Sequence, residues 1–325
     1  MSTERPLPPT ELLHRVGRID APDVGAEYEA IGRRSRERIE RLLPDEWSWE
    51  GRRVLDFGCG AGRTLRHFLA EAEHAEFHGC DIDEPSIAWL TEHFSPPLHV
   101  FPSGEQPQLP QPDGFFDVVY ALSVFTHLTD QWAGWLLELH RVLKPDGLLI
   151  ATFLNEGLWS DFGQGPWDED RVGMNVIKTW NSWDEGGPIV FLSEWWIREH
   201  WGRQFEVLFL ERHDPAETPG GQGAVLLKPR RERLEPKELE RPGGDGRELE
   251  ALRHNVEQLH REASELFAHI RHVTESHTAL TLHAKGLQSE LVRLTQELAT
   301  IERSRSWRVT APLRGATAIV RRRNR

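Results

Sequence analysis

The stretch VLDFGCGAGRTL, residues 54–65, combines one acidic residue with three glycines at alternating positions. Apolar residues lead into Asp56, and Gly58, Gly60 and Gly62 follow before the chain becomes helical in pattern. This order predicts a strand, a glycine-rich turn and a helix start, which together make a pocket of the nucleotide-binding type. A carboxylate two residues before the first glycine adds negative charge that a pyrophosphate does not favour. The pocket therefore suits a cationic ligand better than a phosphorylated dinucleotide.

S-adenosylmethionine is a ligand of that kind, because it carries a sulfonium and an ammonium group and no phosphate. A carboxylate at the strand end, Asp56, can bind the ammonium directly or through water. The glycine spacing also departs from the dinucleotide fingerprint G-x-G-x-x-G, since Arg63 stands where its third glycine belongs. A second acid, Asp81, ends the next predicted strand about twenty residues later, at the usual place of a ribose-binding carboxylate.

Four motifs in this order resemble those of class I S-adenosylmethionine-dependent methyltransferases: VLDFGCGAGRTL, GCDID, LPQPDGFFDVVYALSVFTHL and HRVLKPDGLLIATF. The resemblance covers roughly residues 27–228. It implies an α/β fold with a doubly wound, mostly parallel seven-stranded Rossmann-like sheet, and S-adenosylmethionine as the cofactor.

The resemblance also assigns roles within the pocket. It implies that Asp56, Gly58 and Gly60 hold the methionine end of the cofactor and that Asp81 binds the ribose hydroxyls. The further residues it places are Ile82 beside the adenine, Glu105 near the adenine amine, and Ala121 and Leu122 beside the methionine and the transferred methyl group. The proline-rich surroundings of Glu105 (FPSGEQPQLP) make its alignment loose, and a solvated loop acid is the alternative there.

A general base is useful when a methyl group is transferred to an alcohol, because the acceptor loses its proton. His127, in SVFTHL, follows the fourth predicted strand, whose C-terminal end faces the cofactor crevice. A purely structural histidine is the other interpretation of this position. Asp161 and His200 are looser candidates. No cluster of residues at metal-binding spacing is present in the sequence, so no metal is expected.

The segment 155–201, called the cap segment below, interrupts the alternating pattern and contains seven of the 13 tryptophans. Its Trp, Asp and Gly content suits a carbohydrate or aromatic acceptor, which predicts an inserted acceptor cap. Two of four residues are expected to meet the acceptor: Trp159, Trp167, Trp180 and Trp183. Three others are expected to pack in the core: Trp195, Trp196 and Trp201. The helix predicted over 27–43 is expected to close over the cofactor as a lid.

The elements that position these residues alternate between strand and helix. The pattern predicts strands at 54–57, 76–82, 98–101, 115–122 and 148–154, and helices at 64–72, 86–94 and 132–143. Two further strands, 205–211 and 223–228, are expected to close the sheet as an antiparallel edge. Residues 1–26 are predicted to be a flexible N-terminal segment, and the methyltransferase domain is predicted to span 27–228.

The composition indicates which binding partners and which cellular compartment the protein is expected to have. With 39 Lys and Arg against 52 Asp and Glu, the formal net charge of −13 disfavours a nucleic-acid partner. Cys59 and Cys80 are expected to be buried free thiols, which indicates a reducing compartment. The sequence shows neither a signal peptide nor a membrane-spanning run, so a cytoplasmic location is expected.

The C-terminal part is predicted to be a linker (229–246), a coiled coil (247–303) and a basic tail (304–325). Sixteen seam positions at alternating spacings of three and four run from Leu249 to Ile301, and all of them are apolar except His277. This pattern predicts self-association through residues 249–301 as a coiled coil, with two or three strands left open. A single amphipathic helix packed on the domain is the alternative.

The tail contains seven arginines and no acid, and SRSWRVTAPLR, residues 304–314, resembles a short motif that follows coiled coils in bacterial enzymes of surface-polysaccharide assembly. The tail suits an anionic membrane surface, including the inner membrane face, or an acidic partner, unless it is a frayed, solvated end. We therefore expect an enzyme that O-methylates a sugar hydroxyl in cell-surface glycan biosynthesis. The alternatives are a methyltransferase for an aromatic or natural-product acceptor, and a non-catalytic coiled-coil scaffold.

Overall fold

The structure of the chain is a computed structural model in which residues 5–13, 21–162, 166–179, 182, 187–212 and 221–309 are described. Two compact units are present, Met1–Val256 and Glu257–Arg325. The first unit contains all the predicted cofactor-site residues. The second consists, in its described part, of the continuation of one long helix and a short helix after it.

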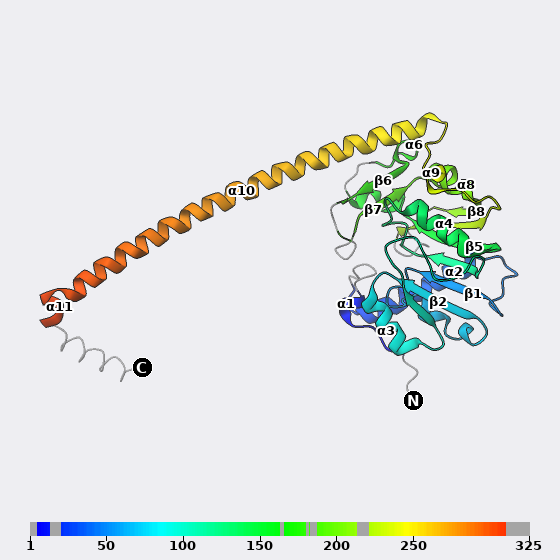
Figure 1. Ribbon diagram of the computed structural model, residues 1–325, viewed down its shortest axis with the longest axis horizontal. Helices are drawn as coiled ribbons and strands as arrows, with labels where there is room; N and C mark the ends of the chain where they lie inside the picture. Colours follow the sequence, from blue (N-terminus) through cyan, green and yellow to red (C-terminus); the bar gives the residue numbers. More distant parts are fainter. Residues whose placement is uncertain are drawn as a thin grey trace. The chain divides into compact units, whose positions relative to one another are not determined.

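The first unit is built on a seven-stranded sheet with the strand order β3-β2-β1-β4-β5-β9-β8 (Figure 1). The strands are β1 (Arg53–Phe57), β2 (Glu76–Asp81), β3 (His99–Pro102), β4 (Phe116–Ala121), β5 (Leu143–Phe153), β8 (Phe205–Glu211) and β9 (Gly223–Pro229). The first five pair in parallel, whereas β9 is antiparallel to both β5 and β8. The predicted doubly wound sheet with an antiparallel edge is confirmed.

Helices cover both faces of this sheet, which explains why its central strands are nearly continuous apolar runs. All six residues of β4 are buried. The helix α4 (Trp132–Val142) packs in one hydrophobic cluster, and the helices α2 (Val24–Leu42) and α3 (Glu84–Phe94) pack in the other. Asp23 caps α2 by accepting a hydrogen bond from the backbone N–H of Ala26 at 3.0 Å.

The helix predicted over 64–72 is wrong in type. Two short 3₁₀ helices stand there, η1 (Leu65–Phe68) and η2 (Glu71–Glu73). All four residues of η1 are buried, including Arg66 and His67, and η1 lies against both α2 and β2. Such a segment has no solvent face, so the tight space between neighbouring elements decides its geometry rather than helix propensity.

The cap segment contains its own small sheet, in which β6 (Met174–Ile177) pairs antiparallel with β7 (Ile189–Leu192). Its short helices are α5 (Glu156–Trp159), η3 (Ser160–Phe162), α6 (Glu169–Val172), α7 (Glu194–Trp196) and the π-helix η5 (Ile197–Trp201), which continues into α8 (Gly202–Gln204). The cap segment is thus a folded layer rather than a loop.

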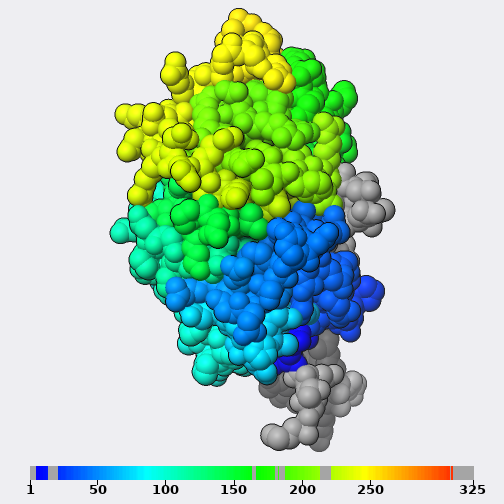
Figure 2. All heavy atoms as spheres, turned by 90° about the vertical axis from the view of Figure 1, so that its right-hand side faces the viewer, coloured from blue at the N-terminus to red at the C-terminus, as the bar shows by residue number. Residues whose placement is uncertain are grey.

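Residues 229–246 differ from the predicted linker, because they belong to the first unit and pack within it. The helix α9 (Pro236–Leu239) buries Leu239 completely, and Figure 2 shows the yellow stretch after β9 spread over the green surface beside it. The described part of the predicted flexible N-terminus also contains a helix, α1 (Thr10–Leu13), whose Leu12 and Leu13 are buried. In both places a few apolar side chains reach the core from segments with polar composition.

The helix α10 (Gly246–Arg303) is 58 residues long and is followed by α11 (Arg305–Val309). This confirms a continuous helix across the predicted coiled coil. The large apolar seam residues from Leu259 to Ile301 are exposed, and their pairing with a second copy stays a prediction. No described helix has the length and apolar character needed to span a lipid bilayer.

Candidate active site

The glycine turn after β1 needs glycine for conformational and steric reasons. Gly58 has a φ of +81°, and Gly60 and Gly62 are also left-handed, with φ of +51° and +76°. A Cβ on Gly58 would lie only 2.3 Å from a methyl group of Val124. The turn therefore brings its backbone close to the segment that follows β4, at the edge where the parallel strands end.

Asp56 is only 3% exposed and faces this turn from β1. Its Oδ2 has no hydrogen-bond partner among the described residues. Burial raises the pKa of Asp56 well above its ordinary value, and Asp81 adds to this, while the Tyr120 hydroxyl and Arg63 act in the opposite direction. A buried carboxylate oxygen without a partner is unusual in a folded protein and marks a place where a ligand group can bind.

Asp81 ties the end of β2 to the glycine turn. One carboxylate oxygen accepts the backbone N–H of Gly60 at 2.6 Å, and the other accepts that of Asp83 at 2.8 Å. Burial raises the pKa of Asp81 in spite of these hydrogen bonds. Each carboxylate oxygen keeps a further lone pair, so Asp81 can hold the turn and still accept hydrogen bonds from ligand hydroxyls.

The other predicted cofactor residues lie at the same edge of the sheet. Ile82 follows β2 directly and is 36% exposed, and Glu105 is exposed on the loop after β3. The backbone N–H of Ser103 donates to the carbonyl of Asp81 at 2.9 Å, which fixes that loop beside the end of β2. Ala121 is buried at the end of β4, and Leu122 is half-buried after it.

His127 is exposed after β4, and its Nδ1 lies 2.8 Å from the carbonyl oxygen of Pro188 in the cap segment. A carbonyl only accepts, so Nδ1 carries the proton and Nε2 of the neutral ring is left as an acceptor. Desolvation lowers the pKa of His127, which favours this neutral form. The ring thus makes a structural bond and keeps one nitrogen able to take a proton.

A polar network surrounds Ser123, which no sequence motif predicted. This residue has a left-handed φ of +61°, and its backbone N–H donates to Oγ1 of Thr152 at 2.7 Å. Nε2 of Gln222 donates to the Ser123 hydroxyl at 2.9 Å, and Arg38 of α2 donates to the carbonyl of Gln222 at 2.8 Å. The only signal available in the sequence was the position of Ser123 just after a strand end.

The predicted lid helix α2 lies directly against the glycine turn. The hydroxyl of the fully buried Tyr28 donates to the carbonyl of Ala61 at 3.2 Å. A Cβ on Gly32 would lie 2.0 Å from the carbonyl oxygen of Arg63. The helix therefore stands where a lid would stand, and its movement over a cofactor stays a prediction.

The tryptophans of the cap segment differ in how deeply they are buried. Trp195, Trp196 and Trp201 are buried, which confirms that they pack in the core. Trp159 is also buried, so it does not offer a face to an acceptor, whereas Trp167 is half-buried. The other two candidates lie outside the described residues: Trp180 and Trp183.

The looser candidate bases differ in exposure. Asp161 is exposed, whereas His200 is 1% exposed with both ring nitrogens already hydrogen-bonded. His200 is therefore wrong as a candidate base. In the described part of the chain, no group of three or more His, Cys, Asp or Glu side chains could hold a metal ion. The two cysteines, Cys59 and Cys80, are buried free thiols as predicted.

A family model described as a methyltransferase domain matches residues 55–149. The matched residues include Asp56, the glycine turn, Asp81 and the segment after β4 that carries Ser123 and His127.

Curated proteins include relatives that match part of this chain. The chain is 31% identical over 137 residues to a 27-O-demethylrifamycin SV methyltransferase of Amycolatopsis mediterranei, a match covering 41% of this chain and 48% of the relative. It is 31% identical over 103 residues to a fatty-acid O-methyltransferase of Mycolicibacterium smegmatis, covering 32% and 37%. The chain thus spans about half or less of the length of these relatives.

Among solved structures, the chain is similar to an S-adenosylmethionine-dependent methyltransferase from Mesorhizobium loti. The identity is 16% and the TM-score is 0.46, and the match covers 59% of this chain and 96% of that one.

Proposed function

We propose that this chain is an S-adenosylmethionine-dependent methyltransferase that transfers a methyl group to a hydroxyl acceptor. One observation carries the proposal. The buried carboxylate of Asp56 stands beside the glycine turn of a methyltransferase domain with one oxygen unpaired among the described residues. A buried carboxylate oxygen without a hydrogen-bond partner destabilises the folded protein until a ligand pairs with it. A cationic group is the partner that a carboxylate favours.

The other residues of the pocket fit the same cofactor. Its ammonium group suits Asp56, its ribose hydroxyls suit the remaining lone pairs of Asp81, and its adenine suits the exposed side chain of Ile82. Glu105 is exposed on the loop next to Ile82, within the region where the adenine amine is expected. When bound, S-adenosylmethionine supplies a methyl group on a positively charged sulfur.

The chain's own task is to align the acceptor and to receive its proton. Methyl transfer is an in-line displacement on an activated donor, so orientation contributes most of the rate increase. The bound cofactor would supply an activated methyl group and keep the electron pair of the broken carbon–sulfur bond, while Nε2 of His127 would take the proton of the acceptor hydroxyl. The Nδ1 bond to Pro188 keeps the ring oriented for this step.

A sugar hydroxyl in cell-surface glycan biosynthesis is the proposed acceptor. The half-buried Trp167 supports it, because its Nε1 donates to the carboxylate of Glu169 at 3.0 Å, and a flat apolar face beside an acid is typical of carbohydrate sites. The exposed Asp161 of the same cap segment is a further acid that an acceptor can reach. The resemblance of residues 304–314 to a motif of surface-polysaccharide enzymes supports it as well. The names of the two relatives point to different acceptors, so they do not choose between a glycan and an aromatic or natural-product acceptor.

The test is a methyl-transfer assay with labelled S-adenosylmethionine against cell-envelope glycan fractions and, separately, against small phenols. Label in the glycan fraction supports the proposal, and label in phenols alone supports the second acceptor class. Calorimetry with S-adenosylmethionine tests the scaffold alternative, because an inactive pocket gives no binding heat at micromolar protein. The Asp56→Asn variant is the matched control in both experiments.

Self-association and location complete the proposal. The seam of α10 from residue 259 to 301 is continuous, helical and exposed, which supports pairing with a second copy of the chain. Light scattering on the full chain tests this, with Leu280→Asp in the seam expected to lower the measured mass. We further propose a cytoplasmic location at the inner membrane face. The arginines of the basic tail support this proposal, and residues 310–325 of the tail lie outside the described residues.

A further inference from the structure

The seam of α10 is a long apolar surface that lies open in the described part of the second unit. This part consists of the continuation of α10 and the short helix α11 (Figure 1). The large apolar side chains of the seam from Leu259 to Ile301 are between 43% and 68% exposed. An apolar stripe of this length on a helix in water needs a partner.

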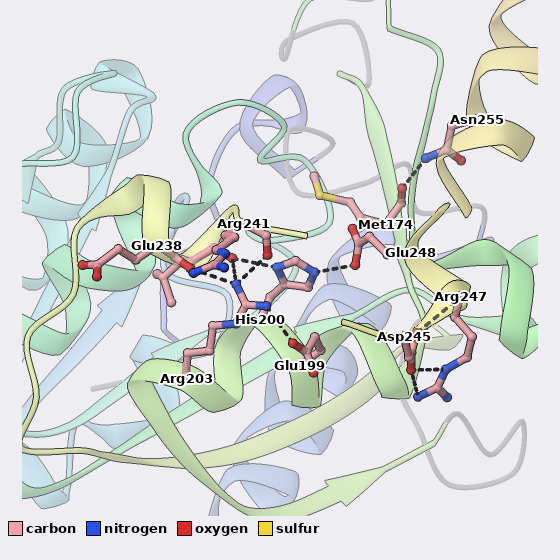
Figure 3. A network of polar contacts seen from close by, with 11 residues as sticks. Met174, Glu199, His200, Arg203, Glu238, Arg241, Asp245, Arg247, Glu248 and Asn255 are labelled. Atoms are coloured by element: carbon pink, nitrogen blue, oxygen red, sulfur yellow. Dashed lines mark hydrogen bonds and ion pairs between the residues drawn. The ribbon is translucent and has the colours of Figure 1, made fainter. Parts of the chain in front are cut away.

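The first turns of α10 show how the seam is kept open. One face of these turns is attached to the cap segment within the first unit: Nε2 of His200 lies 3.0 Å from Oε2 of Glu248, and Nδ2 of Asn255 donates to the carbonyl of Met174 at 2.7 Å (Figure 3). Leu249, the first residue of the seam, is nevertheless 52% exposed. Polar side chains thus fix the helix, and the seam is left free for another chain from its first turn onward.

The two rows of the seam differ in the size of their side chains. Residues at heptad position d are large and apolar throughout: Leu259, Leu266, Val273, Leu280, Leu287, Leu294 and Ile301. Residues at position a include three that are small or polar, Ala263, His277 and Ala284, beside Ile270, Leu291 and Leu298. All the positions that fill a seam poorly are therefore in one row.

The direction of pairing decides which rows meet. In a parallel, in-register coiled coil, position a packs against position a of the partner helix. Ala263 and Ala284 would then form two layers with voids, and His277 would form a layer of facing polar rings. In an antiparallel pair, position a packs against position d, so each of these three residues faces a large apolar side chain. Pairing small with large side chains fills the seam.

The charge along the chain favours the antiparallel direction as well. The tail 304–325 contains seven arginines and no acid, whereas the whole chain has a formal net charge of −13, so the remainder is strongly acidic. A parallel pair gathers both basic tails at one end of the paired helices and both acidic first units at the other, whereas an antiparallel pair keeps like charges apart. The flanking positions do not offset this, because a parallel pair places Glu297 opposite a second glutamate, Glu302.

We propose that α10 pairs with α10 of a second copy as an antiparallel two-stranded coiled coil. The proposal rests on the self-association proposed above and adds the direction and the number of helices. Three identical helices cannot all run antiparallel to one another, so the assembly closes as a twofold pair. In one register all sixteen seam positions pair about residue 275. The facing residues are then Ala263 with Leu287, His277 with Val273, and Ala284 with Leu266.

The experiment measures distances between spin labels in the full-length protein by double electron–electron resonance. The described native cysteines, Cys59 and Cys80, are buried, so labels are attached to one introduced cysteine per chain. Three matched positions on the helix face opposite the seam are used singly: Arg261→Cys, Glu275→Cys and Ser289→Cys. In the antiparallel pair the distance at 275 is set by the width of two helices, about 20 Å, whereas the copies of 261, and of 289, lie about 40 Å apart along the axis.

Three equal short distances would show a parallel coil and overturn the proposal, although the self-association proposed above would stand. Light scattering on the same samples separates the other outcomes. A mass of three chains also overturns the proposal, and a mass of one chain overturns both the proposal and the self-association. Leu280→Asp is the control, because loss of the pair should remove the distances between labels at all three positions.

Discussion

Buried polar groups are treated in opposite ways in the pocket at Asp56 and in the contacts around His200. Both nitrogens of His200 have partners within the chain, whereas Asp56 keeps an oxygen that none of the described residues completes. Polar groups that are completed internally stabilise one arrangement of the chain. A group left incomplete weakens the free protein and gains by binding a ligand, which is why we assign function to Asp56 and structure to His200.

His127 combines the two situations, because its Nδ1 has a partner within the chain and its Nε2 can accept a proton. A substitution can test the structural role and the catalytic role separately. In His127→Asn the side-chain amide can still donate to the carbonyl of Pro188, but it cannot take a proton. We expect kcat to fall by about 10²- to 10⁴-fold, the usual contribution of general base catalysis, with the melting temperature unchanged. The rate is measured with labelled donor and the acceptor found in the assay above. Unchanged kcat would make His127 purely structural.

Asp56→Asn removes the unpaired charge of the pocket. We expect the affinity for S-adenosylmethionine to fall by about 10- to 150-fold, which corresponds to one hydrogen bond to a charged group of about 1.5–3 kcal/mol. Calorimetry measures the change, and Asp161→Asn, an exposed acid of the cap segment, is the control expected to leave it unaltered. Equal affinities of wild type and Asp56→Asn would contradict the assignment of the pocket.

The pH dependence of binding gives a second view of the same carboxyl group. Because the pKa of Asp56 is raised in the free protein, the group is protonated over a wider pH range than an ordinary aspartate. Binding of the ammonium group needs the ionised form, so binding releases a proton below the raised pKa. The affinity therefore falls as the pH is lowered, by up to about tenfold per unit. Calorimetry in buffers of different ionisation heat detects the released proton, and Asp56→Asn should release none.

The glycine turn can be tested for strain and crowding separately. Gly58→Ala forces a left-handed alanine and also meets Val124, whereas Gly51→Ala has the same strain, with φ of +67°, and nothing within 4 Å. We expect Gly51→Ala to cost about 1–2 kcal/mol of unfolding free energy and Gly58→Ala to cost more and to weaken cofactor binding. Denaturant unfolding measures both. Equal losses would show that contact with Val124 is unimportant.

Local patterns were sufficient to predict the sheet and the two acids of the pocket. Apolar runs separated by helical periods predict β1 to β5, and the place of Asp56 and Asp81 follows from their position at strand ends. The same local reasoning failed at residues 64–72, because η1 is completely buried by contacts with other elements, α2 and β2, which its own residue pattern does not report. It predicted a linker at 229–246 because the composition there is charged and proline-rich.

Residues far apart in the sequence form the contacts that sequence reasoning could not find. Leu239 is a single apolar residue among charges, yet it is buried, and its carbonyl is hydrogen-bonded to His200, 39 positions earlier. Ser123 and Gln222 are separated by 99 positions, and no periodic pattern links them. Helix and strand periods report only which face of an element is buried, and not which side chain on another element meets it.

The Ser123 network gives the test with the smallest expected effect. It asks whether a polar group that has its partners within the chain supports only the fold. The Thr152 hydroxyl accepts a hydrogen bond from the backbone N–H of Ser123, a residue with a left-handed φ. Thr152→Val keeps the volume but leaves that N–H without its partner, whereas Thr152→Ser keeps the hydroxyl. We expect Thr152→Val to lose about 1 kcal/mol, which lowers the melting temperature by about 2–4 °C, and Thr152→Ser to lose less. If Ser123 only supports the fold, Thr152→Val should lose the same amount of stability with and without the cofactor. If Thr152→Val instead lowers kcat/KM for the acceptor by more than its loss of stability explains, Ser123 is a positioning residue of the site.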